Sequence, residues 1–159
     1  MNQRLLPRRS LLLISFFLVL VDQLSKSWAR QQLDFGMAKT FIPGLLQLRL
    51  VNNTGAAFSL FSDSTALLGV LSLGVAMGLL IWLWRSQPMH IWQGLALAFL
   101  LGGTIGNGLD RWRLGHVTDF LELLPINFPI FNAADIAINV AVICFGIDAL
   151  TSRHGRQQN

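Results

Sequence analysis

The sequence predicts an all-α membrane protein with four transmembrane helices, a small outward-facing β-sheet and a short interfacial helix. Two observations predict this class. Of the 159 residues, 53% are hydrophobic and only 13% are charged, which is about half the charge of an ordinary soluble domain. The apolar residues also gather in four blocks, each close to the roughly 20 residues that cross a hydrocarbon core about 30 Å thick. A chain of this length is expected to form a single domain, residues 1–159.

The four apolar blocks are the predicted transmembrane segments. They cover residues 11–28, 65–84, 91–109 and 133–150. Tryptophans, whose amphipathic rings prefer the membrane–water interface, fall at the block ends: Trp28, Trp82, Trp84, Trp92 and Trp112. The first block also resembles a cleaved signal peptide, since Arg8 and Arg9 precede it. No small-x-small cleavage site follows it, so we expect an uncleaved helix.

Charge distribution predicts the orientation and the partners. The N-terminal flank, the loop at 85–90 and the C-terminal tail contain bases and no acid, so the positive-inside rule puts both termini in the cytoplasm. Segments 31–64 and 111–132 then face outward. The net charge of +4 forms no continuous basic surface, so we expect membrane lipids rather than nucleic acid as partners. Cys144, in an apolar block, is the single cysteine of the sequence, so an internal disulfide is excluded.

The first outer segment contains a predicted strand. Leu46, Leu48 and Leu50 alternate with polar residues, the period-2 pattern of a strand with one buried face. A Pro-Gly turn at 43–44 precedes it. The apolar stretch at 56–61 is too short to span a membrane and fits an interfacial helix or loop.

Two of the charged residues lie inside the first apolar block. Asp22 and Lys26 are four residues apart with the acid first, the favoured order for a helical ion pair. A charge at the bilayer centre costs about 2.5–3.5 kcal/mol on insertion scales. We therefore expect the pair to support helix packing, with a direct role near the chemistry as the alternative.

The end of the third block combines glycines with polar residues. The glycines between 102 and 108 permit close helix approach in lipid. Asn107, Asp110 and Arg111 lie at i, i+3 and i+4, hence on one side of the helix end. Asp110 beside Arg111 predicts a structural ion pair, although the planar Arg111 guanidinium could equally hold a peptide carbonyl or a lipid phosphate.

Asp119 and Asp135 are the most informative acids. Asp119 is predicted in the outer loop, and Asp135 in the first turn of the fourth helix, with Asn139 one turn further along. The segment between the two acids is long enough to bring them together. Two close carboxyl groups in a low dielectric share a proton, as general acid and general base. Capping of the helix start and ion pairing are the alternative interpretation, since a helix N-terminus favours a carboxylate.

Five blocks of residues, taken in order, resemble the motifs of the lipoprotein signal peptidase (type II signal peptidase) family of bacteria. They are Asp22-Gln23-Leu24-Ser25-Lys26, Asn53-Thr54-Gly55-Ala56-Ala57-Phe58, Gly106-Asn107 with Asp110-Arg111, Val117-Thr118-Asp119-Phe120 and Phe131-Asn132-Ala133-Ala134-Asp135. The resemblance covers nearly the whole chain. Gly108, where a bulkier apolar residue is commoner in the family, is a mild departure that concerns local packing.

The resemblance implies an endopeptidase of the bacterial cytoplasmic (inner) membrane that cleaves prolipoproteins just before a diacylglyceryl-modified cysteine. The implied enzyme is a globomycin-sensitive aspartic protease with no cofactor and no metal, active near the outer leaflet and expected to be a monomer. Asp119 and Asp135 would be catalytic. The implied substrate-binding residues are Asn53, Gly55, Asn107, Arg111 and Asn132. The implied structural support comes from Asp22, Lys26, Asp110 and Asn139.

Three other functions fit parts of the sequence. A Ser–Lys protease would pair Lys26 with a remote serine such as Ser59 or Ser62, because adjacent helical residues do not face each other. A metalloprotease would need clustered ligands, yet the three histidines are scattered and there is no HExxH. A transporter or proton-pathway subunit predicts acids across the bilayer, whereas most lie toward the predicted outer end, Asp148 being the exception.

Overall fold

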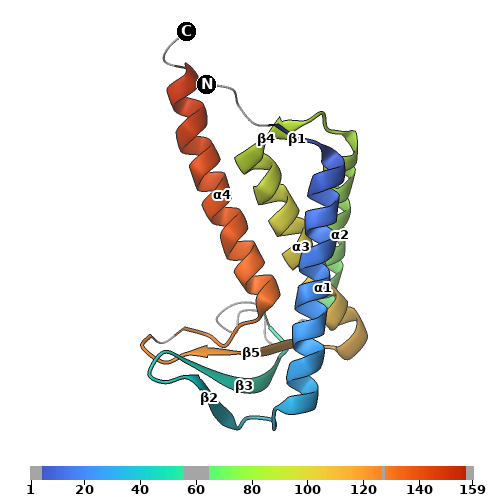
Figure 1. Cartoon of the computed structure of the whole chain (residues 1–159). Helices are drawn as coiled ribbons and strands as arrows, with labels where there is room; N and C mark the ends of the chain where they lie inside the picture. The colour runs from blue at the N-terminus through green and yellow to red at the C-terminus, as the bar shows by residue number, and fades with distance from the viewer. Residues whose placement is uncertain (1–4, 56–64, 127, 157–159) are drawn as a thin grey trace.

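The computed structural model describes residues 5–55, 65–126 and 128–156, with side chains to Thr151. Four helices lie side by side: α1 (Arg8–Gln32), α2 (Thr65–Arg85), α3 (Ile91–Leu114) and α4 (Ala133–Arg156) (Figure 1). Each predicted segment is helical, and each helix is longer than its apolar block. In particular α3 continues to Leu114, so the predicted outer segment 111–132 begins a few residues later than expected, and Arg111 lies on the helix end.

Three helical spans are long and apolar enough to cross a membrane in the described part of the chain: Arg8–Gln32, Thr65–Arg85 and Ala133–Thr151. The molecule is therefore a multi-pass membrane protein. Helix α3 is not among these spans, so the predicted count of four crossings stays a prediction. The physical reason lies in its position: α3 packs against α1, α2 and α4, and a helix surrounded by protein can carry polar residues that a lipid-facing helix cannot.

Glycines allow α3 to approach two neighbouring helices closely. A Cβ added at Gly103 would lie 2.6 Å from the carbonyl oxygen of Ala134 on α4. One added at Gly106 would lie 2.5 Å from Oδ2 of Asp22 on α1. Small residues stabilise helix pairs in lipid by permitting such close approach. Gly108, the departure noted above, faces Ser72 of α2 at 3.2 Å, so a bulkier residue there would require a shift.

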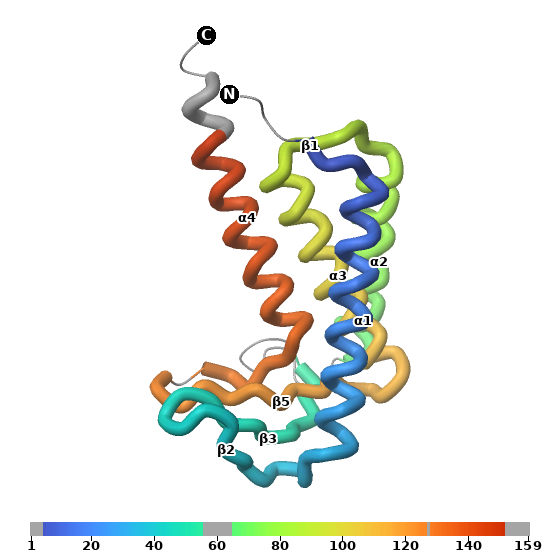
Figure 2. Tube along the Cα trace, in the orientation of Figure 1, coloured from blue at the N-terminus to red at the C-terminus, as the bar shows by residue number. Residues whose placement is uncertain are grey.

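A three-stranded antiparallel sheet lies across one end of the helices (Figure 2). Its strands are β2 (Ala38–Ile42), β3 (Leu46–Asn53) and β5 (Val117–Leu123), in the order β2-β3-β5. The predicted strand at Leu46 to Leu50 is confirmed. Its buried residues Leu48 and Leu50 pack in one cluster with Ala29, Leu33 and Phe120. The predicted interfacial helix at 56–61 lies outside the described residues.

Strand β5 corrects the expectation that Asp119 lies in a loop. In β5, Asp119 is opposite Val51 of β3. Residues 117–120 are all buried, so the inward and outward alternation that identifies a strand in a sequence is missing here.

The opposite end of the molecule carries a second, two-stranded sheet. Strand β1 (Leu5–Leu6) pairs with β4 (Met89–His90), which connects α2 to α3. Next to it, His90 Nδ1 lies 3.0 Å from Oδ1 of Asp148 on α4. Asp148, the acid that lay apart from the others in the sequence, thus joins α4 to this end. The start of α1 and the end of α4 both lie here (Figure 1).

Candidate active site

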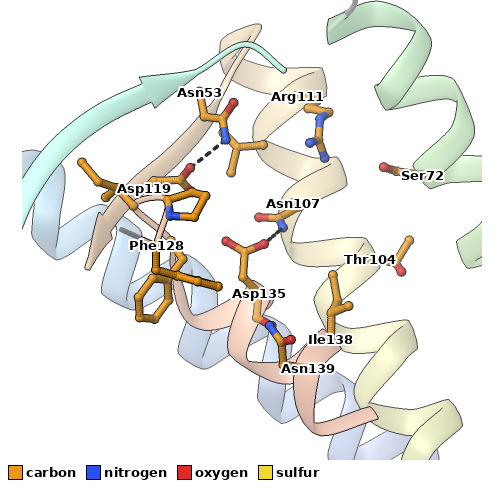
Figure 3. Close-up of a pocket in the computed structure, with 14 residues that line it drawn as sticks. Asn53, Ser72, Thr104, Asn107, Arg111, Asp119, Phe128, Asp135, Ile138 and Asn139 are labelled. Atoms are coloured by element: carbon orange, nitrogen blue, oxygen red, sulfur yellow. Dashed lines mark hydrogen bonds between the residues drawn. The ribbon is translucent and has the colours of Figure 1, made fainter. Parts of the chain in front are cut away.

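A cavity of about 460 Å³ opens between the sheet and helices α3 and α4. Both Asp119 and Asp135 line it (Figure 3). Polar and apolar side chains both contribute to its wall. The lining residues are Asn53, Ser72, Thr104, Asn107, Arg111, Val117, Asp119, Phe128, Pro129, Ile130, Phe131, Asp135, Ile138 and Asn139.

Each carboxylate is held by amide donors. Asp119 is 1% exposed and accepts hydrogen bonds from Nδ2 of Asn53 at 2.9 Å and Nδ2 of Asn132 at 2.6 Å. Asp135, which is partly exposed, accepts from Nδ2 of Asn107 at 2.8 Å and from the backbone N–H of Asn132 at 3.1 Å. The two acids therefore share Asn132 as a partner, one through its side chain and the other through its backbone.

Asn132 occupies this position because it precedes helix α4. Its Oδ1 accepts from the N–H of Asp135 at 3.1 Å, while Asp135 Oδ2 accepts from the N–H of Asn132. This is a capping box, in which each of the two side chains accepts a hydrogen bond from the backbone N–H of the other residue. Capping was the alternative interpretation of Asp135 from the sequence, and the structure contains it. The cap and the approach to Asp119 coexist, since Asn132 uses its oxygen for one and its NH₂ for the other.

A buried network connects the site to helix α1. Asn107 Oδ1 accepts from Nδ2 of Asn132 at 3.1 Å and from Nζ of Lys26 at 2.9 Å. Lys26 is fully buried and lies 2.9 Å from Oδ2 of Asp22, which confirms the predicted pair. Asp22 also accepts the N–H of Ala134, in the first turn of α4, at 2.9 Å. One charged pair thus joins three helices.

The expected ion pair between Asp110 and Arg111 does not form. Asp110 Oδ2 instead lies 3.4 Å from Nζ of Lys26 and accepts the N–H of Thr118 at 2.9 Å. Arg111 points into the cavity (Figure 3), and its Nη2 donates to the carbonyl of Gly55 at 3.2 Å. Successive helical residues differ by about 100° in direction, so the two side chains diverge. Asn107 and Arg111, one turn apart, line the cavity, whereas Asp110 does not.

Other side chains were either placed differently or missed by sequence reasoning. Asn139 donates to the carbonyl of Asp135 in its own helix at 2.9 Å and reaches neither carboxylate. Gln23 was missed, although its Nε2 contacts both Asp22 and Asp110; its place between two charged positions of one motif was the available signal. The apolar wall at 128–131 was missed because a loop has no periodicity to reveal it.

The surroundings of Asp119 raise the pKa of its carboxyl group. Burial raises its pKa, and the charge of Asp135 raises it further, to about 6, while hydrogen bonds from Asn53 and Asn132 act in the opposite direction. Desolvation and a neighbouring like charge both favour the neutral acid. A proton is therefore held at this site much closer to neutral pH than on an ordinary aspartate.

The arrangement defines a multi-pass membrane protein with a two-carboxyl site at one end of its helices. The sequence profile described as signal peptidase (SPase) II matches residues 14–151. The chain belongs to the signal peptidase II family, a family of proteases.

Individual relatives agree with this assignment, and a solved structure shares the fold. The chain is 58% identical over 153 residues to the lipoprotein signal peptidase of Parasynechococcus marenigrum (strain WH8102), covering 96% of each chain. It is 54% identical over 144 residues to that of Synechococcus sp. (strain RCC307), covering 90% of this chain and 95% of the relative. A bacterial membrane enzyme solved in meso at 2.3 Å has the same fold, with a TM-score of 0.89 at 24% identity, covering 100% of this chain and 98% of that one.

Proposed function

We propose that this protein removes the signal peptide from prolipoproteins by cleaving just before a diacylglyceryl-modified cysteine, with Asp119 and Asp135 as a catalytic dyad. The observation that carries the proposal is the shared partner of the two acids. Both carboxylates bind Asn132, and both line one cavity. Names of the relatives above supply the class of substrate.

The proposed mechanism uses one proton shared by two carboxyl groups. The ionised carboxylate takes a proton from a water molecule, which attacks the scissile carbonyl, while the protonated partner donates to the carbonyl oxygen. The resulting tetrahedral diol collapses when the leaving amine is protonated. A pKa of about 6 at Asp119 supports the single-proton state, whose apparent pKa values belong to the pair.

The remaining site residues have proposed roles that follow from their contacts. Arg111 is suited to hold a peptide carbonyl, since it lines the cavity and its buried Nε has no hydrogen-bond partner among the described residues. Asn53 and Gly55, whose carbonyl accepts a hydrogen bond from Arg111, would bind the substrate backbone. Asn107 and Asn132 would border the substrate and orient the carboxylates. The proposed structural supports are Asp22, Lys26, Asp110 and Asn139.

The proposed setting is the bacterial cytoplasmic membrane. We infer four crossings, both termini in the cytoplasm and a monomer of one domain, with the site near the outer leaflet. Support comes from the even number of long helices among the described residues and from the bases at the end away from the aspartates. Acyl chains of the substrate, anchored in the bilayer, would hold the scissile bond at a fixed depth before the reaction.

The test is turnover of a lipidated precursor by purified protein. Asp119→Asn and Asp135→Asn should each lower the rate by at least about 10³-fold, because each removes one proton-transfer group. Asp34→Asn, an exposed acid of the same outer region, is the matched control and should keep full activity. Globomycin should inhibit the wild type. Full turnover by either dyad variant would overturn the proposal.

The rival functions give different results in the same preparation. A transporter would move ions or solute in liposomes and would not cleave the precursor. A Ser–Lys protease would require a serine beside Lys26, whereas Lys26 Nζ contacts Asn107, Asp22 and Asp110. Ser59 and Ser62 lie outside the described residues, so their alanine variants complete the test and should remain active.

A further inference from the structure

Three arginines surround a hollow at the end of the molecule opposite the aspartates. Arg8 and Arg9 begin α1, and Arg85 ends α2. The hollow measures about 540 Å³ and is lined by Pro7, Arg8, Arg9, Arg85, Ser86, Gln87 and Pro88. All three arginine side chains are exposed. Within the described residues, no salt bridge to an acid involves any of them.

An apolar groove of about 360 Å³ adjoins the hollow. It is lined by Leu12 of α1 and by Leu80, Ile81, Trp84 and Arg85 of α2. Arg85 lines both spaces, so the groove leads from the basic hollow along the helices. Both helices are candidate membrane spans, so the groove runs in the direction of a lipid acyl chain.

The hollow is built by contacts between remote segments. Arg8 Nη1 donates to the carbonyl of Trp84 at 3.0 Å, and the guanidinium carbon lies 5.5 Å from the centroid of the Trp84 ring. These contacts fix the start of α1 against the end of α2. Pairing of β1 with β4 holds the neighbouring backbone in place. The Arg8 side chain and the backbone around the hollow are therefore held in place before any ligand arrives.

We propose that this site binds one anionic glycerophospholipid, with its phosphate between Arg8, Arg9 and Arg85 and an acyl chain in the groove. Guanidinium groups bind phosphate oxygens in pairs of parallel hydrogen bonds. Three uncompensated positive charges favour a headgroup with net negative charge over a zwitterionic one, whose amine they would repel. The apolar groove, which shares Arg85 with the hollow, favours a lipid over a free phosphate. The site is independent of the proposed catalytic dyad.

Native mass spectrometry of the full chain in detergent tests this site, with phosphatidylglycerol and phosphatidylcholine as probes. The wild type should retain phosphatidylglycerol preferentially. Arg9→Gln/Arg85→Gln should weaken that binding about tenfold or more, because two bases near the headgroup are lost. Arg8 is left intact because it also holds Trp84. The matched control is Lys39→Gln/Arg113→Gln, which removes two exposed bases at the other end and should bind like the wild type.

Three outcomes would overturn the proposal. Equal lipid binding by the Arg9/Arg85 variant and the wild type would show that these arginines do not form a lipid site. An equal loss of lipid binding in the control variant would mean that the effect comes from the net charge of the protein and not from this site. Displacement of the lipid by soluble glycerol phosphate at millimolar concentration would point to a free phosphate ligand. Unchanged thermal unfolding of both variants in neutral detergent shows that each remains folded, and retained precursor cleavage distinguishes this site from the dyad.

Discussion

Asn132 satisfies several partners at once, which explains why an asparagine suits this position. Its oxygen accepts from Asp135, its NH₂ donates to Asp119 and Asn107, and its backbone N–H donates to Asp135. An aspartate has no donor in its ionised form, and a serine has a single hydroxyl. The side chain is fully buried, so an unmet hydrogen bond there is costly.

Asn53 offers the sharpest test of the electrostatics of Asp119. Its hydrogen bond lowers the pKa of Asp119, so Asn53→Ala should raise that pKa. The upper apparent pKa of the carboxyl pair then rises, and the alkaline limb of the pH–rate profile moves to higher pH. A shift of about one pH unit corresponds to the loss of a hydrogen bond worth about 1–1.5 kcal/mol.

The measurement for Asn53 is kcat/KM across the pH range, since this parameter reports ionisations of the free enzyme. Asn52→Ala, the exposed neighbour on the same strand, is the matched control and should leave the profile in place. A limb that stays fixed or moves to lower pH in Asn53→Ala would contradict the assignment, even if the rate falls.

At the scale of elements, the start of α4 carries both stability and the arrangement of the site. Asn132→Ala should lose the helix cap, at a cost of about 1 kcal/mol, as well as the bond to Asp119. Asn132→Ser should keep the cap, since serine is as good an N-cap as asparagine, but it cannot reach Asp119 at the same time. We therefore expect Asn132→Ser to retain a higher melting temperature than Asn132→Ala, with equally low activity.

Thermal unfolding in detergent, followed beside precursor cleavage, checks this separation. Asn52→Ala, at an exposed position outside the cavity lining, serves as the control and should keep the activity and melting temperature of the wild type. If Asn132→Ser were fully active, the bond from Asn132 to Asp119 would have no part in the reaction. If it were as unstable as the alanine variant, the capping argument would be wrong.

Elements that repeat a pattern could be predicted from the sequence, whereas contacts between remote elements could not. The four helices and strand β3 follow from apolar length and from alternation, and Asp22 and Lys26 pair as their spacing indicates. Strand β5 was missed because residues 117–120 are all buried. Asp110 was given the wrong partner because sequence adjacency says little about direction on a helix.

The residues of the site are predicted by motif resemblance, whereas their mutual geometry is not. Spacing alone favoured capping over catalysis for Asp135, and no periodicity could reveal that Asn132 contacts both acids. Its bond to Asp119 spans 13 residues of sequence and depends on how the chain after β5 returns to α4. Such a contact is a property of tertiary structure, so it had to come from the fold.

Across the whole molecule, α3 connects the two ends and joins the other three helices. It begins beside the basic end at His90 and reaches the cavity with Asn107 and Arg111. The hydrogen-bond network of the site requires α1 and α4 to lie close enough for Lys26 and Asn132 both to contact Asn107. The glycines of α3 allow that close approach, which makes helix packing a condition for the proposed catalysis.

Gly103→Ala tests this dependence. The new methyl group would lie 2.6 Å from the carbonyl oxygen of Ala134, backbone that cannot move without displacing the start of α4. We expect lower thermal stability together with a large loss of activity, although alanine favours a helix by about 1 kcal/mol over glycine. Gly74→Ala on α2 is the matched control, since nothing lies within 4 Å of its added carbon. It should be as active as the wild type and at least as stable in thermal unfolding. Equal behaviour of the two variants would mean that the α3–α4 separation tolerates a methyl group, and the catalytic geometry would then have to depend on the hydrogen-bond network alone.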